Sequence, residues 1–273
     1  MKLSIATVSL SGDLAEKLDA IAAAGFEGVE IFENDLLSFS GTPGDVRKLI
    51  GDLGLAIIAF QPFRDFEGMP ADKRERVFAR AERKFDVMQE LGCDLLLVCS
   101  NVSPESLGGI ERAAADLNEL GERANKRGLR IGFEALAWGQ HINDYRDAWE
   151  AVRRADHPAV GLVLDSFHTL ARKTELRAMG SIPRERIFLV QVADAPALDM
   201  EPLSWSRHFR SFPARATCRS SNSWRRCNRP ASPAAFRSRS STISSGRARR
   251  AAWPSTATAR CCSFWTSSGR GQD

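Results

Sequence analysis

The feature that most constrains the fold is a regular alternation of short aliphatic segments with longer amphipathic ones, which runs from the start of the chain to about residue 192. Such alternation is typical of parallel βα units, because each buried strand needs a helix to cross back over the sheet. The predicted strands are Lys2–Val8, Gly28–Phe32, Ala56–Phe60, Asp94–Cys99, Arg130–Glu134, Val160–Leu164 and Ile187–Val192. The predicted helices are Leu14–Ala24, Thr42–Leu53, Ala71–Leu91, Pro104–Arg127, His141–Ala155 and a short one within Leu170–Met179.

Seven strands in series predict an α/β fold, a (β/α)₈ TIM barrel that lacks its eighth strand. The length of 273 residues is enough for one such barrel. We therefore expect residues 1–213 to form a single catalytic domain with its functional site at the carboxyl ends of the strands.

The composition changes abruptly after Pro213. Residues 214–273 contain 12 Arg, 13 Ser and four Cys, but no Leu, no Val and one Ile. Without a periodic apolar face, neither a helix nor a strand can be assigned there, so we expect a disordered basic tail. The first and seventh strands would then be left with unpaired edges.

The tail also has the composition expected of a sequence translated out of frame. Arg237–Ile243 can be encoded by CGC TCG AGA TCT TCA ACG ATC, and reading from the third base of this stretch gives Leu-Glu-Ile-Phe-Asn-Asp. The segments ARATCRSSNSWRRC and WPSTATARCCSFWTSSG regain an apolar periodicity in the same register. We therefore hypothesise that residues 214–273 result from a frameshift near Pro213.

The charge distribution excludes several classes of partner. The formal net charge is +4, but 12 of the 38 basic residues and only one of the 34 acidic residues lie in the tail, so residues 1–213 are acidic overall. An acidic domain argues against nucleic-acid binding, and no apolar run is long enough to span a membrane. The N-terminal segment does not have the pattern of a secretory signal, so we expect a cytoplasmic protein.

The cysteines show no metal-binding spacing. Cys93 and Cys99 flank a predicted strand, and the other four lie in the tail. We expect reduced thiols with a structural role.

Three polar side chains mark the ends of neighbouring predicted strands. Glu134 ends the fifth strand, Asp165 follows the sixth, and Gln191 lies in the seventh. Because these ends converge at one end of a barrel, two carboxylates and a carboxamide would form an oxygen cluster suited to Mg²⁺ or Mn²⁺, with Co²⁺ as a further candidate. A cation would also relieve the repulsion between the carboxylates. Asp165 taken alone is equally well explained as a helix N-cap.

Four motifs resemble those of the bacterial 3-dehydroshikimate dehydratases, a family within the xylose-isomerase-like superfamily of sugar isomerases and epimerases. They are IGFEALAWG, GLVLDSFHTL, RIFLVQVAD and SWSRHFRSFP, and the likeness covers about residues 1–213. The resemblance implies a divalent metal held by Glu134, Asp165, Gln191 and a final Glu from the eighth strand. That last ligand is missing from the chain as given, but the out-of-frame peptide contains it. Some relatives also carry a C-terminal dioxygenase-like domain.

The reaction implied by the resemblance is the dehydration of a small molecule, 3-dehydroshikimate, to protocatechuate in quinate and shikimate catabolism. The metal would polarise the ketone, with His168 as candidate acid or base beside Glu134 and Asp165. The substrate carboxylate calls for arginine, and Arg64 and Arg210 are the leading candidates, although either is equally well explained as a bracing residue. Weaker candidates for substrate binding are Ser206 and His141, and for orienting a ligand or hydroxyl Glu30 and Glu33.

Two alternatives stay open. The same barrel and metal would serve a sugar isomerase or epimerase, or an inosose-type dehydratase, and a neutral sugar would need no arginine clamp at Arg64 or Arg210. Alternatively, the chain is an inactive truncated product that cannot complete its metal site. Assembly into a homo-oligomer is compatible with either.

Overall fold

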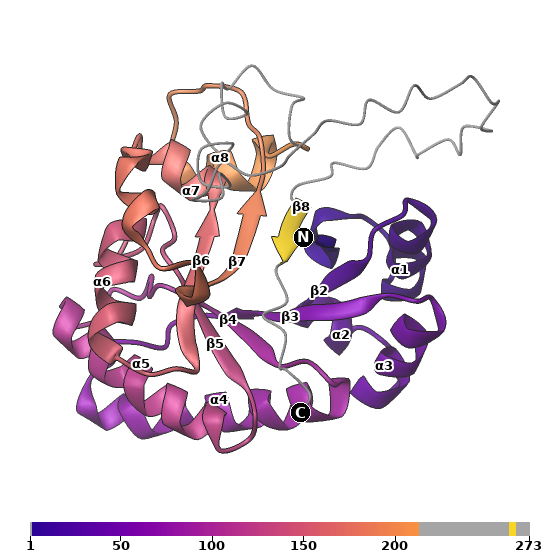
Figure 1. Ribbon diagram of the computed structural model, residues 1–273, viewed down its shortest axis with the longest axis horizontal. Helices are drawn as coiled ribbons and strands as arrows, with labels where there is room; N and C mark the ends of the chain where they lie inside the picture. The colour runs from indigo at the N-terminus through magenta and orange to yellow at the C-terminus, as the bar shows by residue number, and fades with distance from the viewer. Residues whose placement is uncertain (1, 213–261, 266–273) are drawn as a thin grey trace, which may run out of the picture.

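A cylinder of strands surrounded by helices forms the described part of the chain. The computed structural model describes residues 2–212 and 262–265 (Figure 1). Its strands are β1 Lys2–Ala6, β2 Gly28–Phe32, β3 Ala56–Phe63, β4 Leu95–Cys99, β5 Arg130–Glu134, β6 Val160–Asp165, β7 Ile187–Val192 and β8 Cys262–Trp265. β1 to β7 pair in chain order and in parallel, as predicted, and with β8 they form a closed barrel. We call the end at which the parallel strands finish the barrel mouth.

The barrel has an eighth strand, which was not predicted from the sequence. β8 runs antiparallel to both neighbours, with Ser263 opposite Ser4 on β1 and opposite Gln191 on β7. The prediction that nothing beyond Pro213 forms a strand is therefore wrong, as is the prediction of unpaired edges on the first and seventh strands. A ladder joins backbone N–H and C=O groups and needs no apolar periodicity, so four residues leave no signal in the sequence. The rest of the predicted tail lies outside the described residues.

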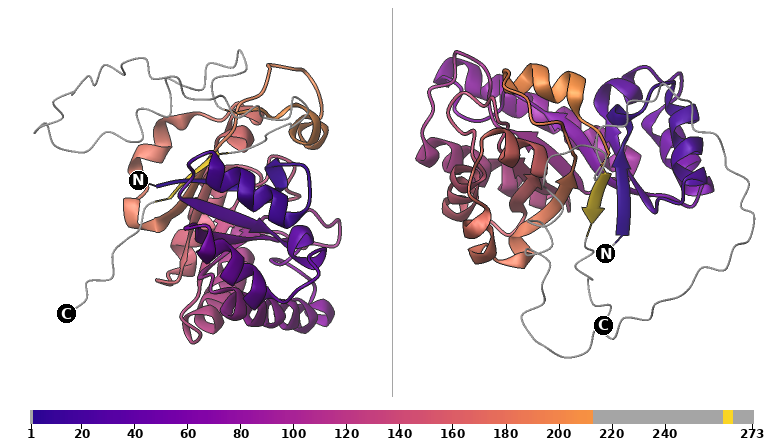
Figure 2. Two further views of the ribbon diagram at one scale, coloured as in Figure 1. Left: turned by 90° about the vertical axis from the view of Figure 1, so that its right-hand side faces the viewer. Right: turned by 90° about the horizontal axis from the view of Figure 1, so that it is seen from above.

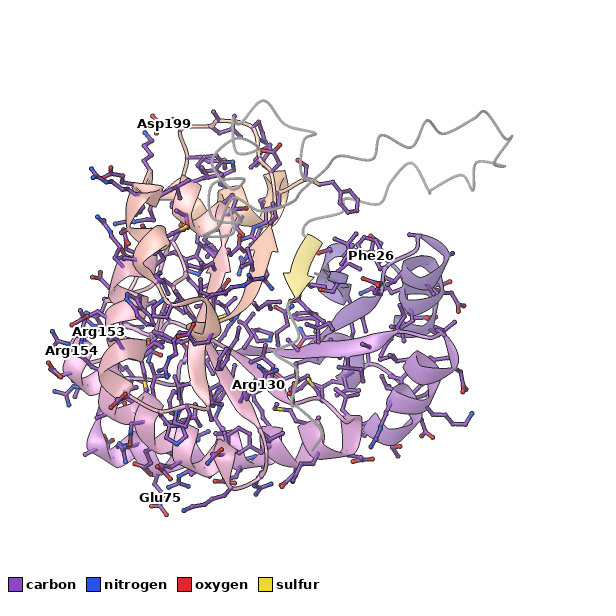
Figure 3. The ribbon with its side chains drawn as sticks, viewed as in Figure 1. Phe26, Glu75, Arg130, Arg153, Arg154 and Asp199 are labelled. Atoms are coloured by element: carbon purple, nitrogen blue, oxygen red, sulfur yellow. The ribbon has the colours of Figure 1, made fainter. Side chains whose placement is uncertain are left out.

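Helices cover the outside of the barrel. They are α1 Leu14–Ala23, α2 Glu33–Leu37, α3 Pro43–Asp52, α4 Ala71–Leu91, α5 Ile110–Asn125, α6 Tyr145–Ala155, α7 Ser166–Ala171 and α8 Pro202–Phe209, with 3₁₀ turns at Thr7–Ser9, Leu176–Ser181 and Arg184–Arg186. Local chemistry fixes several starts: the Asp13 and Thr42 side chains each form a capping box at the first turn of α1 and α3. Figure 3 shows Glu75 on α4 and Arg153 on α6 pointing away from the barrel.

Some predicted helix boundaries are wrong, for local reasons. The helix predicted from Pro104 begins at Ile110, because Gly108 and Gly109 adopt φ of 67° and 94°, which no helix accommodates. The helix predicted from His141 begins at Tyr145, where the Asp144 side chain accepts a hydrogen bond from the backbone N–H of Arg146. The short helices α2 and α8 were not predicted, and the helix predicted within Leu170–Met179 is divided between α7 and a 3₁₀ turn.

The apolar core has two layers, one inside the barrel and one between the strands and the helices. The inner layer includes Ile58, Leu95, Leu97, Val163, Phe188 and Leu189. The larger outer layer is built from helix residues such as Leu18, Phe85 and Leu117, which pack against strand residues such as Ile31 and Phe133. The two views of Figure 2 show the helices wrapped around the sheet.

A glycine on β6 makes room for the largest side chain of the inner layer. A Cβ on Gly161 would lie 2.6 Å from the ring of Phe188. We expect Gly161→Val to lower the free energy of unfolding by about 2 kcal/mol, because the interior cannot take the added volume without moving the ring. Chemical denaturation measures this. Gly51→Ala on α3, where a Cβ meets nothing within 4 Å, is the control and should be neutral or mildly stabilising. Equal effects of the two variants would contradict the packing argument.

The structure also bears on the thiols and on the character of the helices. Cys93 and Cys99 are buried and free, which confirms the expectation of unpaired thiols for these two. Among the helices of the described residues, none combines the length and the apolar character that crossing a membrane requires.

Candidate metal centre

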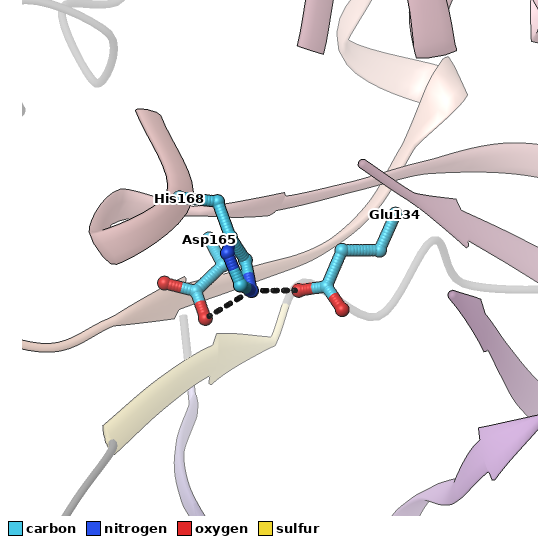
Figure 4. Close-up of side chains that lie close together, drawn as sticks. All are labelled: Glu134, Asp165 and His168. Atoms are coloured by element: carbon cyan, nitrogen blue, oxygen red, sulfur yellow. Dashed lines mark ion pairs between the residues drawn. The ribbon is translucent and has the colours of Figure 1, made fainter. Parts of the chain in front are cut away.

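Three buried side chains converge at the barrel mouth. Glu134 ends β5, Asp165 ends β6, and His168 lies one turn later on α7, and each offers an oxygen or nitrogen atom within 4.8 Å of the others (Figure 4). The Nε2 atom of His168 lies 3.7 Å from Oδ2 of Asp165 and 3.9 Å from Oε1 of Glu134. The three residues are 4–6% exposed, so the cluster is shielded from bulk water.

Asp165 has two tasks, one for each carboxylate oxygen. Its Oδ1 accepts a hydrogen bond of 2.7 Å from the backbone N–H of Phe167 and so caps α7, while Oδ2 faces His168. The two interpretations considered from sequence, helix cap and cluster member, are therefore compatible. Capping fixes the start of α7 and thereby the position of His168 relative to the carboxylates.

N–H groups face both ring nitrogens of His168. The backbone N–H of Ala137 lies 3.1 Å from Nδ1, and Nη2 of Arg210 lies 3.2 Å from Nε2. Burial lowers the pKa of the ring to about 3, which keeps it neutral. A neutral imidazole accepts a hydrogen bond at one nitrogen only, so only one of these two contacts is a hydrogen bond. His168 therefore lies between the carboxylates and Arg210 as a neutral ring.

Arg210 reaches the cluster from α8. Trp205 anchors that helix by packing edge-on against Phe167 at 5.5 Å between ring centroids. A backbone bridge between Asp194 and Ser211 then fixes the residue that follows Arg210. The guanidinium lies 4.4 Å above the ring of Phe167, and Nη1 lies 2.8 Å from Oδ2 of Asp165. In this structure Arg210 is an ion-pair partner of Asp165.

The electrostatics of the cluster favour an added cation. Burial, followed by the charge of Asp165, raises the pKa of Glu134 to about 8, and the charge of Arg210 opposes this only in part. Oε2 of Glu134 accepts a hydrogen bond from the Cys99 thiol over 3.5 Å, while the buried Oε1 has no hydrogen-bond partner among the described residues. A buried carboxylate oxygen without a donor is costly, and a divalent cation would satisfy it. The residues present therefore fit a divalent metal ion.

Gln191 adjoins this cluster on the next strand. It pairs with Asp165 in the β6–β7 register and is 5% exposed. Its Nε2 donates to Oε2 of Glu30 over 2.6 Å, and Gln61 donates to the same oxygen over 2.8 Å. Since a carboxylate oxygen can only accept, the amide nitrogen of Gln191 must be the atom bound to Glu30. This leaves the amide oxygen as the atom that Gln191 can offer to a metal.

The remaining candidates from the sequence are not members of this three-residue cluster. Arg64 is exposed on the β3–α4 loop, and its charge acts on the Cys99 thiol, so it lies within electrostatic reach of the mouth. Ser206 is half-buried on α8. His141 is exposed and binds the backbone carbonyl of Ser106 through Nε2 at 2.8 Å. Glu33 forms an ion pair with Lys84 of α4, away from the cluster.

The sequence analysis missed several residues that shape the site. Cys99 was assigned a purely structural role, although its thiol contacts Glu134. Gln61, which holds Glu30, was not considered, nor was Trp138, whose ring packs edge-on against His168 at 4.9 Å. The signal that identified Glu134, its position at the end of a strand, applies equally to Cys99.

The fold and the buried cluster of Glu134, Asp165 and His168 define the class of protein, a TIM barrel with a candidate metal site at its mouth, and comparison with known proteins shows its family. The family model described as "Xylose isomerase-like TIM barrel" matches residues 18–213, so the chain belongs to this family. A protein of Pseudomonas putida named 3-dehydroshikimate dehydratase is 62% identical over 213 residues, which are 78% of this chain and 34% of that protein.

Two solved structures agree with this assignment. One titled "xylose isomerase-like TIM barrel/4-hydroxyphenylpyruvate dioxygenase fusion protein" is 62% identical, with a TM-score of 0.78 over 78% of this chain and 34% of the other. The IOLI protein, whose title mentions a binding zinc atom, is 21% identical, with a TM-score of 0.69 over 80% of this chain and 81% of the other, and shows the shared fold. The present chain thus spans about a third of the length of the relatives it matches at 62% identity.

Proposed function

We propose that the barrel catalyses the dehydration of 3-dehydroshikimate to protocatechuate with the help of a divalent metal ion. The observation that carries the proposal is the convergence of Glu134, Asp165 and His168 at one buried point of the mouth. The identity of 62% to a protein named for this activity supports it. The test is the appearance of the aromatic product's absorbance when 3-dehydroshikimate and Mg²⁺ or Mn²⁺ are added to the chain with its reading frame restored after Pro213. Absence of product with every metal tried would refute the proposal.

Each residue of the centre has a task in this reaction. Glu134, Asp165 and the amide oxygen of Gln191 would hold the metal ion, whose contribution when bound is to polarise the substrate ketone and stabilise an enolate. His168 is neutral and lies beside both carboxylates, where its ring can form a hydrogen bond to a substrate oxygen. Glu30 holds the Gln191 amide in place, and the buried walls exclude water.

The substrate carboxylate distinguishes this reaction from the isomerisation or epimerisation of a neutral sugar. Arg64 is the cleaner probe, because Arg210 is paired with Asp165 and its replacement would also disturb the centre. We expect Arg64→Met to raise KM for 3-dehydroshikimate by roughly 10- to 100-fold with a smaller change in kcat, since a charged hydrogen bond is lost. Steady-state kinetics measure both constants. Unchanged kinetics would rule out Arg64 as the partner of the substrate carboxylate.

We also propose that residues 214–273 are translated out of frame and that residues 1–213 are the catalytic domain. The family match ends at residue 213, and the identity to the Pseudomonas putida protein covers 213 residues. Within β8, residues 262–265 supply Cys, Ser, Phe and Trp and therefore no carboxylate. The nucleotide sequence around the Pro213 codon tests the proposal, and codons incompatible with the shifted reading would exclude it.

A further inference from the structure

A second buried carboxyl group lies near the mouth, in the loop between β3 and α4. Glu67 is 4% exposed, and its Oε1 accepts a hydrogen bond of 2.6 Å from the backbone N–H of Asn101. The backbone carbonyl of Glu67 accepts a second one, of 2.7 Å, from Nδ2 of Asn101. The other carboxyl oxygen, Oε2, has no hydrogen-bond partner among the described residues. Neither the metal centre nor the fold core accounts for this group.

Asn101 connects Glu67 to the rest of the mouth. It is 2% exposed, its Oδ1 accepts from the backbone N–H of Ser103, and its carbonyl accepts from that of Gln140, both over 2.8 Å. Asn101 therefore joins the β3–α4, β4–α5 and β5–α6 loops. The last of these is the loop whose Ala137 N–H fixes His168.

The β3–α4 loop also carries Arg64, three residues before Glu67. The carbonyls of Arg64 and Asp65 accept hydrogen bonds from the Arg80 guanidinium over 2.9 Å and 3.4 Å. Oδ1 of Asp65 accepts from the backbone N–H of Val102 over 3.3 Å. The backbone of the Arg64 loop is thus held against α4 and the β4–α5 loop, and Glu67 contributes its shortest link to the latter.

The surroundings of Glu67 disfavour a negative charge. The charged groups around it are Asp65 on the same loop and Asp116 on α5, whose Oδ1 is paired at 3.0 Å with Arg74 of α4. Burial, reinforced by the two aspartates, raises the pKa of Glu67 to about 8. Near neutral pH the side chain is therefore a carboxylic acid, and its ionisation adds a negative charge close enough to the mouth to act on Cys99.

We propose that Glu67 is a positioning residue for substrate. Through its bonds to Asn101 it sets the position of the Arg64 loop relative to the metal centre. In its neutral form it does not repel a substrate carboxylate at the mouth. The inference rests on the proposed function, because it concerns how the same site takes an anionic substrate. Loss of the link displaces Arg64, and ionisation of Glu67 repels the substrate carboxylate and attracts Arg64 away from it.

Two variants and a control separate these effects. Glu67→Gln keeps an acceptor for the Asn101 N–H and cannot ionise, whereas Glu67→Leu removes the acceptor. Glu105→Gln changes an exposed carboxylate on the β4–α5 loop and serves as the control. The probe is shikimate, a carboxylate without the ketone, titrated calorimetrically into the 273-residue chain with Mn²⁺ at pH 7 and pH 9. In parallel, the NMR shift of the Asn101 backbone amide is followed over the same pH range.

We expect the wild-type chain and the control to lose roughly tenfold in shikimate affinity between pH 7 and pH 9, while Glu67→Gln loses less than about threefold. Glu67→Leu should bind weakly at both pH values. The Asn101 amide should titrate with a midpoint near pH 8 in the wild-type chain and not in Glu67→Gln. Identical pH profiles of the wild-type chain and Glu67→Gln would overturn the inference, even if Glu67→Leu fails to fold. If the wild-type chain binds no shikimate, the proposed function fails, and a flat Asn101 titration would then overturn the link as well.

Discussion

Replacing Glu134 with Gln is expected to weaken divalent-metal binding by at least about 100-fold and to abolish dehydration, while making the metal-free chain more stable. Glu134 is buried beside Asp165, which raises its pKa to about 8, so the folded chain must take up a proton or carry an unfavourable charge. The pKa in the folded state lies above the ordinary value of 4.5, so stability is lost as pH rises between these two values. Gln cannot ionise and escapes this loss.

The measurement is thermal and chemical denaturation with and without metal. In the presence of a chelator at pH 7, the free energy of unfolding of Glu134→Gln should exceed that of the wild-type chain by about 2 kcal/mol. This difference should vanish below pH 4.5. With excess Mn²⁺ the order should reverse, because only the wild-type chain gains binding energy. Glu105→Gln is the control and should respond to neither condition. If Glu134→Gln is more stable than the wild-type chain both with and without Mn²⁺, Glu134 is not a metal ligand.

Restoring the reading frame after Pro213 is expected to produce the second large effect. The restored chain would carry the Leu-Glu-Ile-Phe-Asn-Asp segment and with it a further carboxylate for the metal centre. We expect metal affinity to rise by at least about 100-fold and dehydratase activity to rise from a low or undetectable level to one set by the complete site. Isothermal titration with Mn²⁺ and the product absorbance assay measure the two quantities.

A matched variant identifies the cause of that gain. In the restored chain, changing the Glu of the new segment to Gln should return metal affinity to that of the present chain without unfolding the barrel. If the present chain already binds metal and turns over substrate as well as the restored one, the missing ligand is unimportant. The alternative of an inactive truncated product would then be wrong.

The sequence was sufficient to predict the parallel strands and the two carboxylates of the centre. Strands such as Leu95–Cys99 and Arg130–Glu134 are buried on both faces, so they appear as continuous apolar runs, and the TIM-barrel rule then places Glu134 and Asp165 at one end. Gln191 follows from the same rule. These inferences depend only on periodicity and on which end of a strand a residue occupies.

The roles of His168 and Arg210 could not be predicted, because they depend on contacts between loops distant in sequence. The ring of His168 is held between the N–H of Ala137, 31 residues away, and the guanidinium of Arg210, 42 residues away. Arg210 approaches Asp165 only because α8 packs on Phe167 through Trp205. Neither contact leaves a pattern in the sequence. The same holds for β8, whose place is decided by backbone pairing.

The direction of β8 has a consequence for what can occupy the slot between β1 and β7. The edges of β1 and β7 both pair with the four residues of β8, which run antiparallel to them. Cys262 lies opposite both Ile5 and Val192, near the mouth. The slot therefore discriminates poorly between peptides, since amide groups on any extended segment can satisfy it. Closing the barrel and completing a metal site are thus separate requirements in this protein, because a short antiparallel strand meets the first through its backbone alone.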